Sequence, residues 1–213
     1  MQAFIFDMDG VIIDSEPIHT KIIRTTLIEH NITISDEEFD KFIGMSSTAV
    51  FSHFIKLYNL PYTSEEMLID HMTQFKNYII EHHLRPIDGI LSLIQNLKAK
   101  NIPLAIASSS PLDVIQFVTK AFNIEQYFQC IISGEDLPRS KPDPTIYLKT
   151  AQTLQIDPTQ CVVLEDSTNG CIAAKNANMY CIGFINPNSG KQNLSQADIT
   201  INKINDINLD TLY

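Results

Sequence analysis

Basic residues are scarce in this chain of 213 residues, and so are long apolar runs. There are 15 Lys and Arg against 25 Asp and Glu, which gives a formal net charge of −10. Binding to nucleic acid or to an anionic membrane needs a positively charged surface, so this balance argues against both kinds of partner. No apolar stretch approaches the roughly 20 residues that a membrane-spanning helix requires.

Cysteine is also sparse, and its positions show no pairing pattern. No CxxC motif is present, and the N-terminus carries no segment typical of a secretory signal. Disulfide-rich domains and zinc sites depend on regular cysteine spacing, so we expect buried, reduced thiols and a cytoplasmic protein. The cysteines concerned are Cys130, Cys161, Cys171 and Cys181.

What the chain does have is apolar material with two distinct periodicities. Its hydrophobic content of 44% can bury a sizeable core. After an apolar strand at 3–7, helical spacing dominates up to residue 100, and short apolar runs then alternate with helical segments. This alternation predicts an α/β fold with a doubly wound, Rossmann-like parallel sheet. The predicted helices are 16–30, 46–58, 64–83, 88–100, 111–122, 143–155 and 168–177, and the later strands are 102–107, 129–132, 161–164 and 180–184.

A helical block interrupts this rhythm directly after the first strand. We therefore predict a catalytic core formed by residues 1–14 and 85–213, with residues 15–84 inserted as an all-helical cap. The insertion falls at the carboxyl edge of the sheet, where ligands bind in such folds. Ser46 and Ser64 are the expected N-caps of two cap helices, and the tail from Ser195 is weakly patterned.

Two carboxylates follow the first strand, in the sequence Asp7-Met8-Asp9-Gly10. Side chains at i and i+2 of an extended segment point the same way, and Gly10 permits a sharp turn after them. Two anions so close need a cation or a shared proton. With a divalent metal, Asp7 can act as a nucleophile and Asp9 as a proton donor and acceptor. Alternatively, the pair is only a strand end followed by a turn.

Three further polar clusters follow strands or precede helices. Ser108, Ser109 and Ser110 end a strand, where hydroxyls and backbone N–H groups can hold an anion, although Ser110-Pro111 is also an ordinary helix start. Lys141 precedes a predicted helix and is the second candidate, although it could equally be a solvated surface lysine. A second acidic pair, Glu165 and Asp166, ends another strand, and such charges are also common at helix N-termini.

Taken together, these segments resemble the haloacid dehalogenase-like hydrolase superfamily. The resemblance is closest to its branch of small phosphatases and β-phosphoglucomutase-like phosphohexomutases with a helical cap. It covers nearly the whole chain, and the motifs are specific for the superfamily rather than for a substrate. They are FDMDGVIIDSEP at 6–17, ASSS at 107–110, SKPDP at 140–144 and LEDSTNG at 164–170.

The resemblance implies phosphoryl transfer that depends on Mg²⁺. It makes Asp7 the nucleophile that becomes an aspartyl phosphate, and Asp9 the general acid and base that also offers its backbone carbonyl to the metal. The presence of Asp9 argues against dehalogenase activity, because a leaving halide needs no proton. The implied phosphate-binding residues are Ser108, Lys141 and the backbone around Ser109, and the implied metal ligands are Asp7, Asp9, Asp166 and Glu165.

Substrate choice is expected to depend on the cap. His19 matches a histidine common near the cap hinge and is a candidate substrate-binding residue, or alternatively a helix-surface residue. Residues 44–47 resemble the cap loop that closes over the site in the family. Ser47 stands where the mutases have an arginine, and Ile43 where they typically have a lysine, which disfavours the mutase reading.

The sequence thus predicts a magnesium-dependent phosphatase for a small phosphorylated metabolite, a sugar phosphate above all. A β-phosphoglucomutase-like phosphohexomutase is the alternative. A non-catalytic binding or regulatory protein on the same fold is a second one. A monomer is favoured.

Overall fold

The computed structural model describes residues 1–39, 42 and 47–212, and it divides the chain into two compact units. The first unit contains Met1–Asp14 and Leu84–Tyr213, and the second contains Ser15–His83. Residues 44–46 of the predicted cap loop, including the expected N-cap Ser46, and Ile43 before them lie outside the described residues, whereas Ser47 is described. That the second unit acts as a cap stays a prediction.

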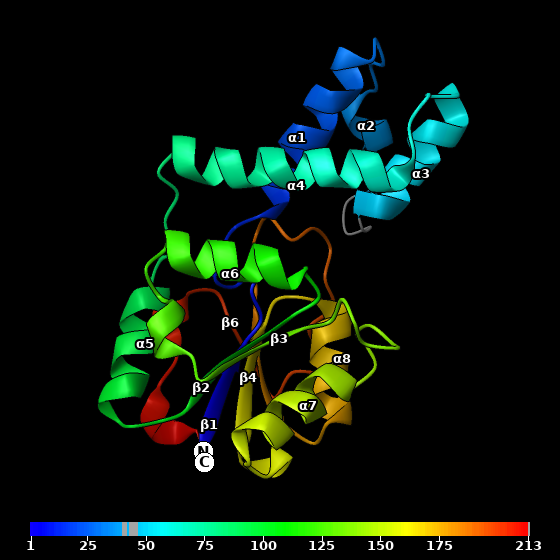
Figure 1. Cartoon of the computed structure of the whole chain (residues 1–213). Coiled ribbons are helices and arrows are strands. Elements are labelled where there is room, and N and C mark those ends of the chain that lie inside the picture. Colours follow the sequence, from blue (N-terminus) through cyan, green and yellow to red (C-terminus); the bar gives the residue numbers. More distant parts are fainter. Residues whose placement is uncertain (40–41, 43–46, 213) are drawn as a thin grey trace. The chain divides into compact units, whose positions relative to one another are not determined.

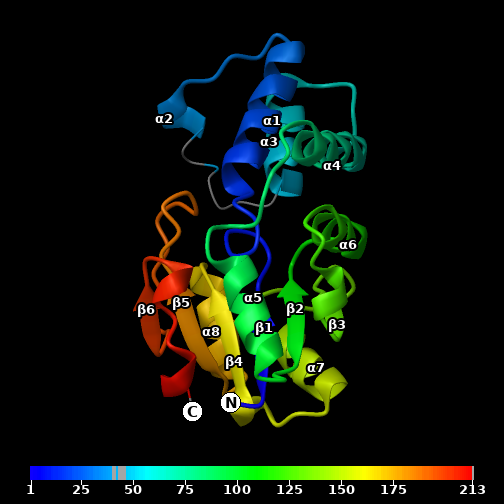
Figure 2. The ribbon, with the colours of Figure 1, turned by 90° about the vertical axis from the view of Figure 1, so that its left-hand side faces the viewer.

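The first unit is built on one parallel sheet of six strands in the order β3-β2-β1-β4-β5-β6. Figure 2 shows this order from β6 at the left to β3 at the right. Strand β1 lies between β2 and β4, so the direction of winding reverses beside it, and in such folds ligands bind outside the carboxyl ends of the strands at this point. The strands are β1 (Ala3–Phe6), β2 (Leu104–Ser108), β3 (Cys130–Ser133), β4 (Cys161–Glu165), β5 (Tyr180–Phe184) and β6 (Ile199–Ile201).

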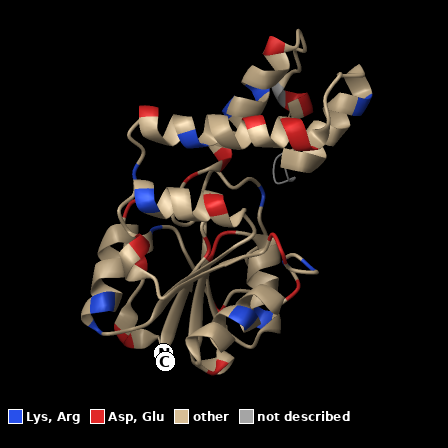
Figure 3. Ribbon diagram, in the orientation of Figure 1, with Lys and Arg blue, Asp and Glu red and all other residues tan. Residues whose placement is uncertain are grey.

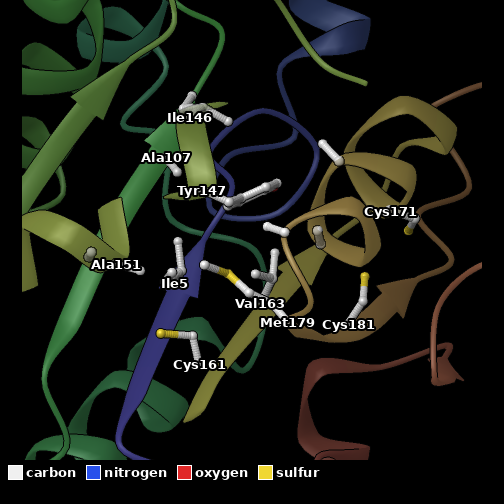
Figure 4. Packing of buried hydrophobic residues seen from close by; sticks show 14 of the residues in the cluster. Ile5, Ala107, Ile146, Tyr147, Ala151, Cys161, Val163, Cys171, Met179 and Cys181 are labelled. Carbon is white, nitrogen blue, oxygen red and sulfur yellow. The ribbon is translucent and has the colours of Figure 1, made fainter. Parts of the chain in front are cut away.

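Helices cover both faces of this sheet, with α5 on one face and α7 and α8 on the other (Figure 1). Side chains that alternate along β1 explain the two layers, because Ile5 packs with Tyr147 of α7 and Cys171 of α8 in one buried cluster (Figure 4). Cys161, Cys171 and Cys181 are buried there as free thiols, whereas Cys130 is half-buried. The helices are α5 (Ile90–Ala99), α6 (Leu112–Ala121), α7 (Thr145–Leu154) and α8 (Thr168–Asn176), and the short 3-10 helices are η2 (Glu125–Tyr127), η3 (Pro158–Gln160), η4 (Ile204–Asp206) and η5 (Leu209–Thr211).

The predicted α/β fold with a Rossmann-like parallel sheet is confirmed, with two local corrections. The tail from Ser195 contains a sixth strand, β6, whose three residues are too few to give a clear periodicity. The N-cap of α4 is Thr63 rather than Ser64. The Thr63 hydroxyl accepts a hydrogen bond from Glu66 N, and the Glu66 carboxylate accepts one from Thr63 N, which forms a capping box.

In the described residues the second unit is helical and has its own apolar core. Its helices are α1 (Glu16–Glu29), α2 (Asp36–Phe39), α3 (Ser47–Tyr58) and α4 (Ser64–Glu81). Leu27, Phe51, Phe54 and Met67 pack in one cluster that joins α1, α3 and α4. The structure contains, among its described residues, no helix with the length and hydropathy needed to cross a membrane.

A histidine lies inside this helical core. His71 of α4 is 1% exposed, and its Nε2 atom is 2.9 Å from His19 Nδ1 and 3.4 Å from Ser47 Oγ. His71 Nδ1 is buried without a hydrogen-bond partner. Burial, with a smaller contribution from His19, lowers the pKa of His71 from 6.5 to about 3. The folded unit therefore keeps this imidazole neutral.

We expect the free energy of unfolding to fall as the pH drops below about 6.5. The unfolded chain then protonates His71, whereas the folded chain does not until about pH 3. Between pH 7 and pH 5, this difference amounts to about 2 kcal/mol. Urea unfolding followed by circular dichroism at the two pH values measures it.

The comparison variant is His71→Leu, which removes the titrating group and fills the buried position with an apolar side chain. It should lose less stability than the unaltered protein between pH 7 and pH 5, even if it is less stable at both. His53→Gln, at an exposed position, should behave as the unaltered protein does. An equal pH dependence in His71→Leu and the unaltered protein would contradict the assignment.

Candidate active site

The Asp pair lies on a tight turn at the end of β1. Asp7 N donates to Leu164 O of β4 at 3.0 Å, which continues the sheet pairing one residue past the strand. Gly10 has a φ of +76° and donates from its N atom to Ile13 O at 2.7 Å. The chain thus turns back directly after the two carboxylates, as Gly10 led us to expect.

Lys141 brings the ends of two strands together. Its Nζ atom lies 2.6 Å from Asp7 Oδ1, 2.6 Å from Glu165 Oε1 and 3.2 Å from Ala107 O. Its side chain is only 7% exposed. Asp143, two residues later, accepts a hydrogen bond from Thr145 N at the start of α7. The loop thus buries Lys141, and the alternative of a solvated surface lysine is wrong.

Glu165 is hydrogen-bonded through both of its oxygens. Oε1 accepts from Lys141 and from the Tyr147 hydroxyl at 2.6 Å. Oε2 accepts from Asp166 N, Ser167 N and Ser167 Oγ at 2.9–3.1 Å. A Cβ atom at Gly170 would lie 1.8 Å from Glu165 Oε1, so this glycine leaves the space that the carboxylate fills.

Asp9 faces the serine loop after β2. Its Oδ2 atom accepts from Ser110 Oγ at 2.5 Å, while Ser108 Oγ lies at 3.5 Å. Ser110 N donates to Ser108 Oγ at 3.1 Å, and Ser133 Oγ donates to Ser110 O at 2.7 Å. Asp9 Oδ1 is buried without a hydrogen-bond partner, so one acceptor of this carboxylate is left for a group outside the protein.

The electrostatics of the cluster are unbalanced. Burial raises the pKa of Asp7 well above its ordinary value. The Lys141 charge opposes this upward shift, and the charges of the neighbouring carboxylates add to it. Burial and the charge of Glu165 raise the pKa of Asp166 to about 7. Burial alone would lower the pKa of Lys141 and raise that of Glu165. The charges of Asp7 and Glu165 raise the pKa of Lys141 instead, and the Lys141 charge lowers the pKa of Glu165, so Lys141 and Glu165 are both ionised.

A divalent cation fits this imbalance. Asp7, Glu165 and Asp166 are buried and each offers one oxygen within 4.8 Å of the others. Four carboxylates share the site with the Lys141 ammonium, and Figure 3 shows acidic residues, in red, on the loops beyond the carboxyl ends of the strands. Because burial makes uncompensated negative charge costly, a hard cation bound by oxygen ligands would lower the energy of the site.

The structure gathers six of the predicted site residues at one edge of the sheet: Asp7, Asp9, Ser108, Lys141, Glu165 and Asp166. Ser109, also a predicted site residue, lies in the loop after β2, and its side chain is exposed. His19 belongs to the helical unit, where its ring stacks on Phe75 with centroids 4.5 Å apart. It is paired with His71, so it is not a simple helix-surface residue.

Sequence reasoning missed Tyr147 as a member of this site and left two alternatives for Ser110, part of an anion-holding loop or an ordinary helix start. The Ser110 hydroxyl contacts Asp9, and Pro111 is the N-cap of α6. Tyr147 is fully buried, with its hydroxyl on Glu165 and its ring 5.0 Å from Lys141 Nζ. The available signal was its spacing of six residues from Lys141, which does not distinguish a core tyrosine from one that supports a site.

Comparisons with known proteins agree with this geometry. The model of the family "Haloacid dehalogenase-like hydrolase" matches residues 4–184. Hexitol phosphatase B of Escherichia coli (strain K12) is 32% identical over 181 residues, covering 84% of this chain and 82% of that protein. The phosphorylated carbohydrates phosphatase of Thermotoga maritima is 29% identical over 217 residues, which cover 97% of this chain and 96% of that protein.

A solved structure shows the same architecture. The crystal structure of β-phosphoglucomutase from Clostridium difficile superposes with a TM-score of 0.80 at 26% sequence identity, covering 99% of this chain and 94% of that one. The predicted resemblance is therefore confirmed. The chain belongs to the haloacid dehalogenase-like hydrolase family and is a phosphoric monoester hydrolase.

Proposed function

We propose that this protein is a Mg²⁺-dependent phosphatase that hydrolyses a small sugar phosphate through an aspartyl phosphate on Asp7. One observation carries the proposal. The buried Lys141 lies 2.6 Å from Asp7 Oδ1, and a second aspartate, Asp9, faces the serine loop after β2 at the same edge of the sheet. This combination offers a nucleophile, a proton carrier and a fixed positive charge. The names of the two relatives, phosphatases of hexitols and of phosphorylated carbohydrates, support the sugar-phosphate class.

In the first step an Asp7 carboxylate oxygen attacks phosphorus, and the bond from phosphorus to the leaving oxygen breaks. Asp9 gives its proton to that oxygen, so the alcohol leaves neutral. In the second step Asp9 takes a proton from water, whose oxygen attacks phosphorus and releases inorganic phosphate from Asp7. Lys141 and the Ser108 hydroxyl are assigned to the phosphate oxygens, with the backbone around Ser109 as support.

Phosphatases of this family generally use a divalent metal ion. We assign Asp7, Asp166 and the backbone carbonyl of Asp9 as its ligands. When bound, Mg²⁺ would neutralise the carboxylates and the phosphate and hold them in alignment. Glu165 was predicted as a further ligand. Its five hydrogen bonds to protein donors favour a different role, that of fixing Lys141.

The mutase alternative needs a cation for the second phosphate of a bisphosphate intermediate. Ser47, at the position of the mutase arginine, begins α3 and lies 3.4 Å from His71 Nε2. Two basic residues of the helical unit are placed over aromatic rings, Lys21 over Tyr78 at 4.7 Å and Arg24 over Phe39 at 4.3 Å. Lys41, a further basic residue of this unit, lies outside the described residues. The serine at position 47, where the mutases have an arginine, is the observation that favours hydrolysis over isomerisation.

The first test is a screen of phosphorylated sugars and hexitols in Mg²⁺, with phosphate release and isomer formation recorded separately. We expect inorganic phosphate from at least one substrate, no activity in excess EDTA, and recovery when Mg²⁺ is restored. Asp7→Asn, which keeps the side-chain shape, should be inactive. Isomer formed from β-glucose 1-phosphate faster than phosphate would favour the mutase. Absence of turnover, with p-nitrophenyl phosphate included, would favour a binding protein.

The role of Asp9 can be separated from general damage to the site by varying the leaving group. Asp9→Asn should lose roughly 10²–10⁴-fold in kcat for an alkyl phosphate, whose alkoxide needs a proton. The loss should be much smaller for p-nitrophenyl phosphate, because its phenolate leaves unprotonated. Equal losses for the two substrates would remove Asp9 from the role of general acid.

Replacing Lys141 with Ala should raise KM and lower kcat together. A hydrogen bond to a charged group contributes about 1.5–3 kcal/mol, so kcat/KM should fall roughly 10- to 100-fold. The variant should also be less stable, because Asp7 and Glu165 lose their counter-charge. Lys149→Ala, which changes an exposed lysine of α7, is the matched control. Unchanged kcat and KM in Lys141→Ala would show that phosphate does not contact this residue.

A further inference from the structure

The loop that follows β5 contacts separate parts of the core unit. Asn186 Nδ2 donates to Gly10 O at 2.9 Å and to Asp14 Oδ1 at 3.3 Å. Asn188 Nδ2 donates to Asp14 Oδ2 at 2.6 Å. Gln192 Oε1 accepts from Thr168 N at 2.9 Å at the start of α8. Residues 186–192 therefore join the turn after the Asp pair to the helix that follows the second acidic pair.

Ser189 lies at the centre of this loop and touches the site itself. Its hydroxyl donates a hydrogen bond to Asp166 Oδ2. Its own backbone is held in place, since Ser189 N donates to Asn186 O at 3.3 Å and Ser189 O accepts from Gln192 Nε2 at 2.9 Å. The hydroxyl is thus presented by a loop that is itself anchored, rather than by a freely rotating surface residue.

Gly10 makes this contact possible. A Cβ atom at Gly10 would lie 1.9 Å from Asp166 Oδ2 and 2.8 Å from Ser189 Oγ. The absence of a side chain at this turn position therefore leaves room for both groups. Asp166 is 6% exposed, so little water is available to replace the serine as a donor.

We propose that Ser189 is a positioning residue for Asp166: by holding Oδ2, it directs the other carboxylate oxygen toward the metal. This inference rests on the assignment of Asp166 as a metal ligand under the proposed function. A hydrogen bond to a ligating carboxylate fixes its rotation, and removal of such a bond typically weakens metal affinity by 10- to 100-fold. No motif marked Ser189, because it lies 23 residues after Asp166 in a loop of its own.

The test is metal binding measured by isothermal titration calorimetry with Mn²⁺ and with Mg²⁺, in the absence of substrate. Ser189→Ala should weaken binding by roughly 10- to 100-fold. Ser189→Thr keeps the hydroxyl and should restore most of the affinity. Ser195→Ala removes an exposed serine hydroxyl from the same C-terminal segment and should bind metal as the unaltered protein does. In turnover assays the Mg²⁺ concentration for half-maximal rate should rise in Ser189→Ala, with KM for substrate little changed at saturating Mg²⁺.

Several outcomes would overturn the proposal. Unchanged metal affinity in Ser189→Ala would do so, even if the variant were less stable, because a purely structural role predicts lower stability alone. An equal loss in Ser189→Thr would exclude the hydroxyl as the active feature. Calorimetry also separates this inference from the proposed function. A chain that binds Mn²⁺ without hydrolysing any phosphate ester still tests Ser189, whereas an unaltered chain that binds no metal refutes both.

Discussion

The Lys141 ammonium joins two buried carboxylates that would otherwise repel each other. It lies 2.6 Å from Asp7 after β1 and 2.6 Å from Glu165 at the end of β4. Such a group is tolerated inside a protein only when its charges are matched and its remaining acceptors are hydrogen-bonded. Tyr147 of α7 supplies one of those hydrogen bonds, and the backbone at the start of α8 supplies others. The ends of two strands and the starts of two helices are therefore mutually fixed by one cation.

The sheet topology makes this arrangement possible. With β1 between β2 and β4, the loops after the central strands approach one another at the same edge. Asp7 follows β1 and Asp166 follows the neighbouring strand β4, and the serine loop follows β2, which pairs with the other edge of β1. Lys141 comes from the loop that leads into α7, so it reaches the edge from outside the strands. The order of the strands in the sheet is therefore enough to bring these loops together, whatever residues the strands themselves contain.

Much of this site could be predicted from the sequence because its residues directly follow apolar runs. Asp7, Ser108 and Glu165 are one residue beyond or at the end of their strands, so the prediction of a strand also places the side chain. Tyr147 and Ser189 could not be found this way, and for Ser110 an ordinary helix start remained as an alternative. The position of Tyr147 does not distinguish it from a core tyrosine. Ser189 contacts Asp166 because the loop after β5 folds back toward the site, which no local sequence pattern indicates. The strand β6 was missed for a similar reason, since three residues pair only because β5 is already in place.

The acidity of the chain poses a question for a protein that binds phosphate esters. The net charge of −10 repels an anionic substrate, but most of these charges are exposed, and salt screens them beyond about 8–10 Å. In the proposed function the Lys141 ammonium would meet the phosphate at contact distance in a buried site, where an ion pair at 4 Å is worth about 4 kcal/mol at an effective dielectric of 20. Local attraction therefore outweighs distant repulsion. Asp7, Asp9 and Asp166 also lie close to Lys141, so one ammonium does not balance the carboxylates, and the raised pKa values of Asp7 and Asp166 reflect burial together with this excess of negative charge. The metal ion proposed for the site would offset it without requiring these carboxylates to be protonated.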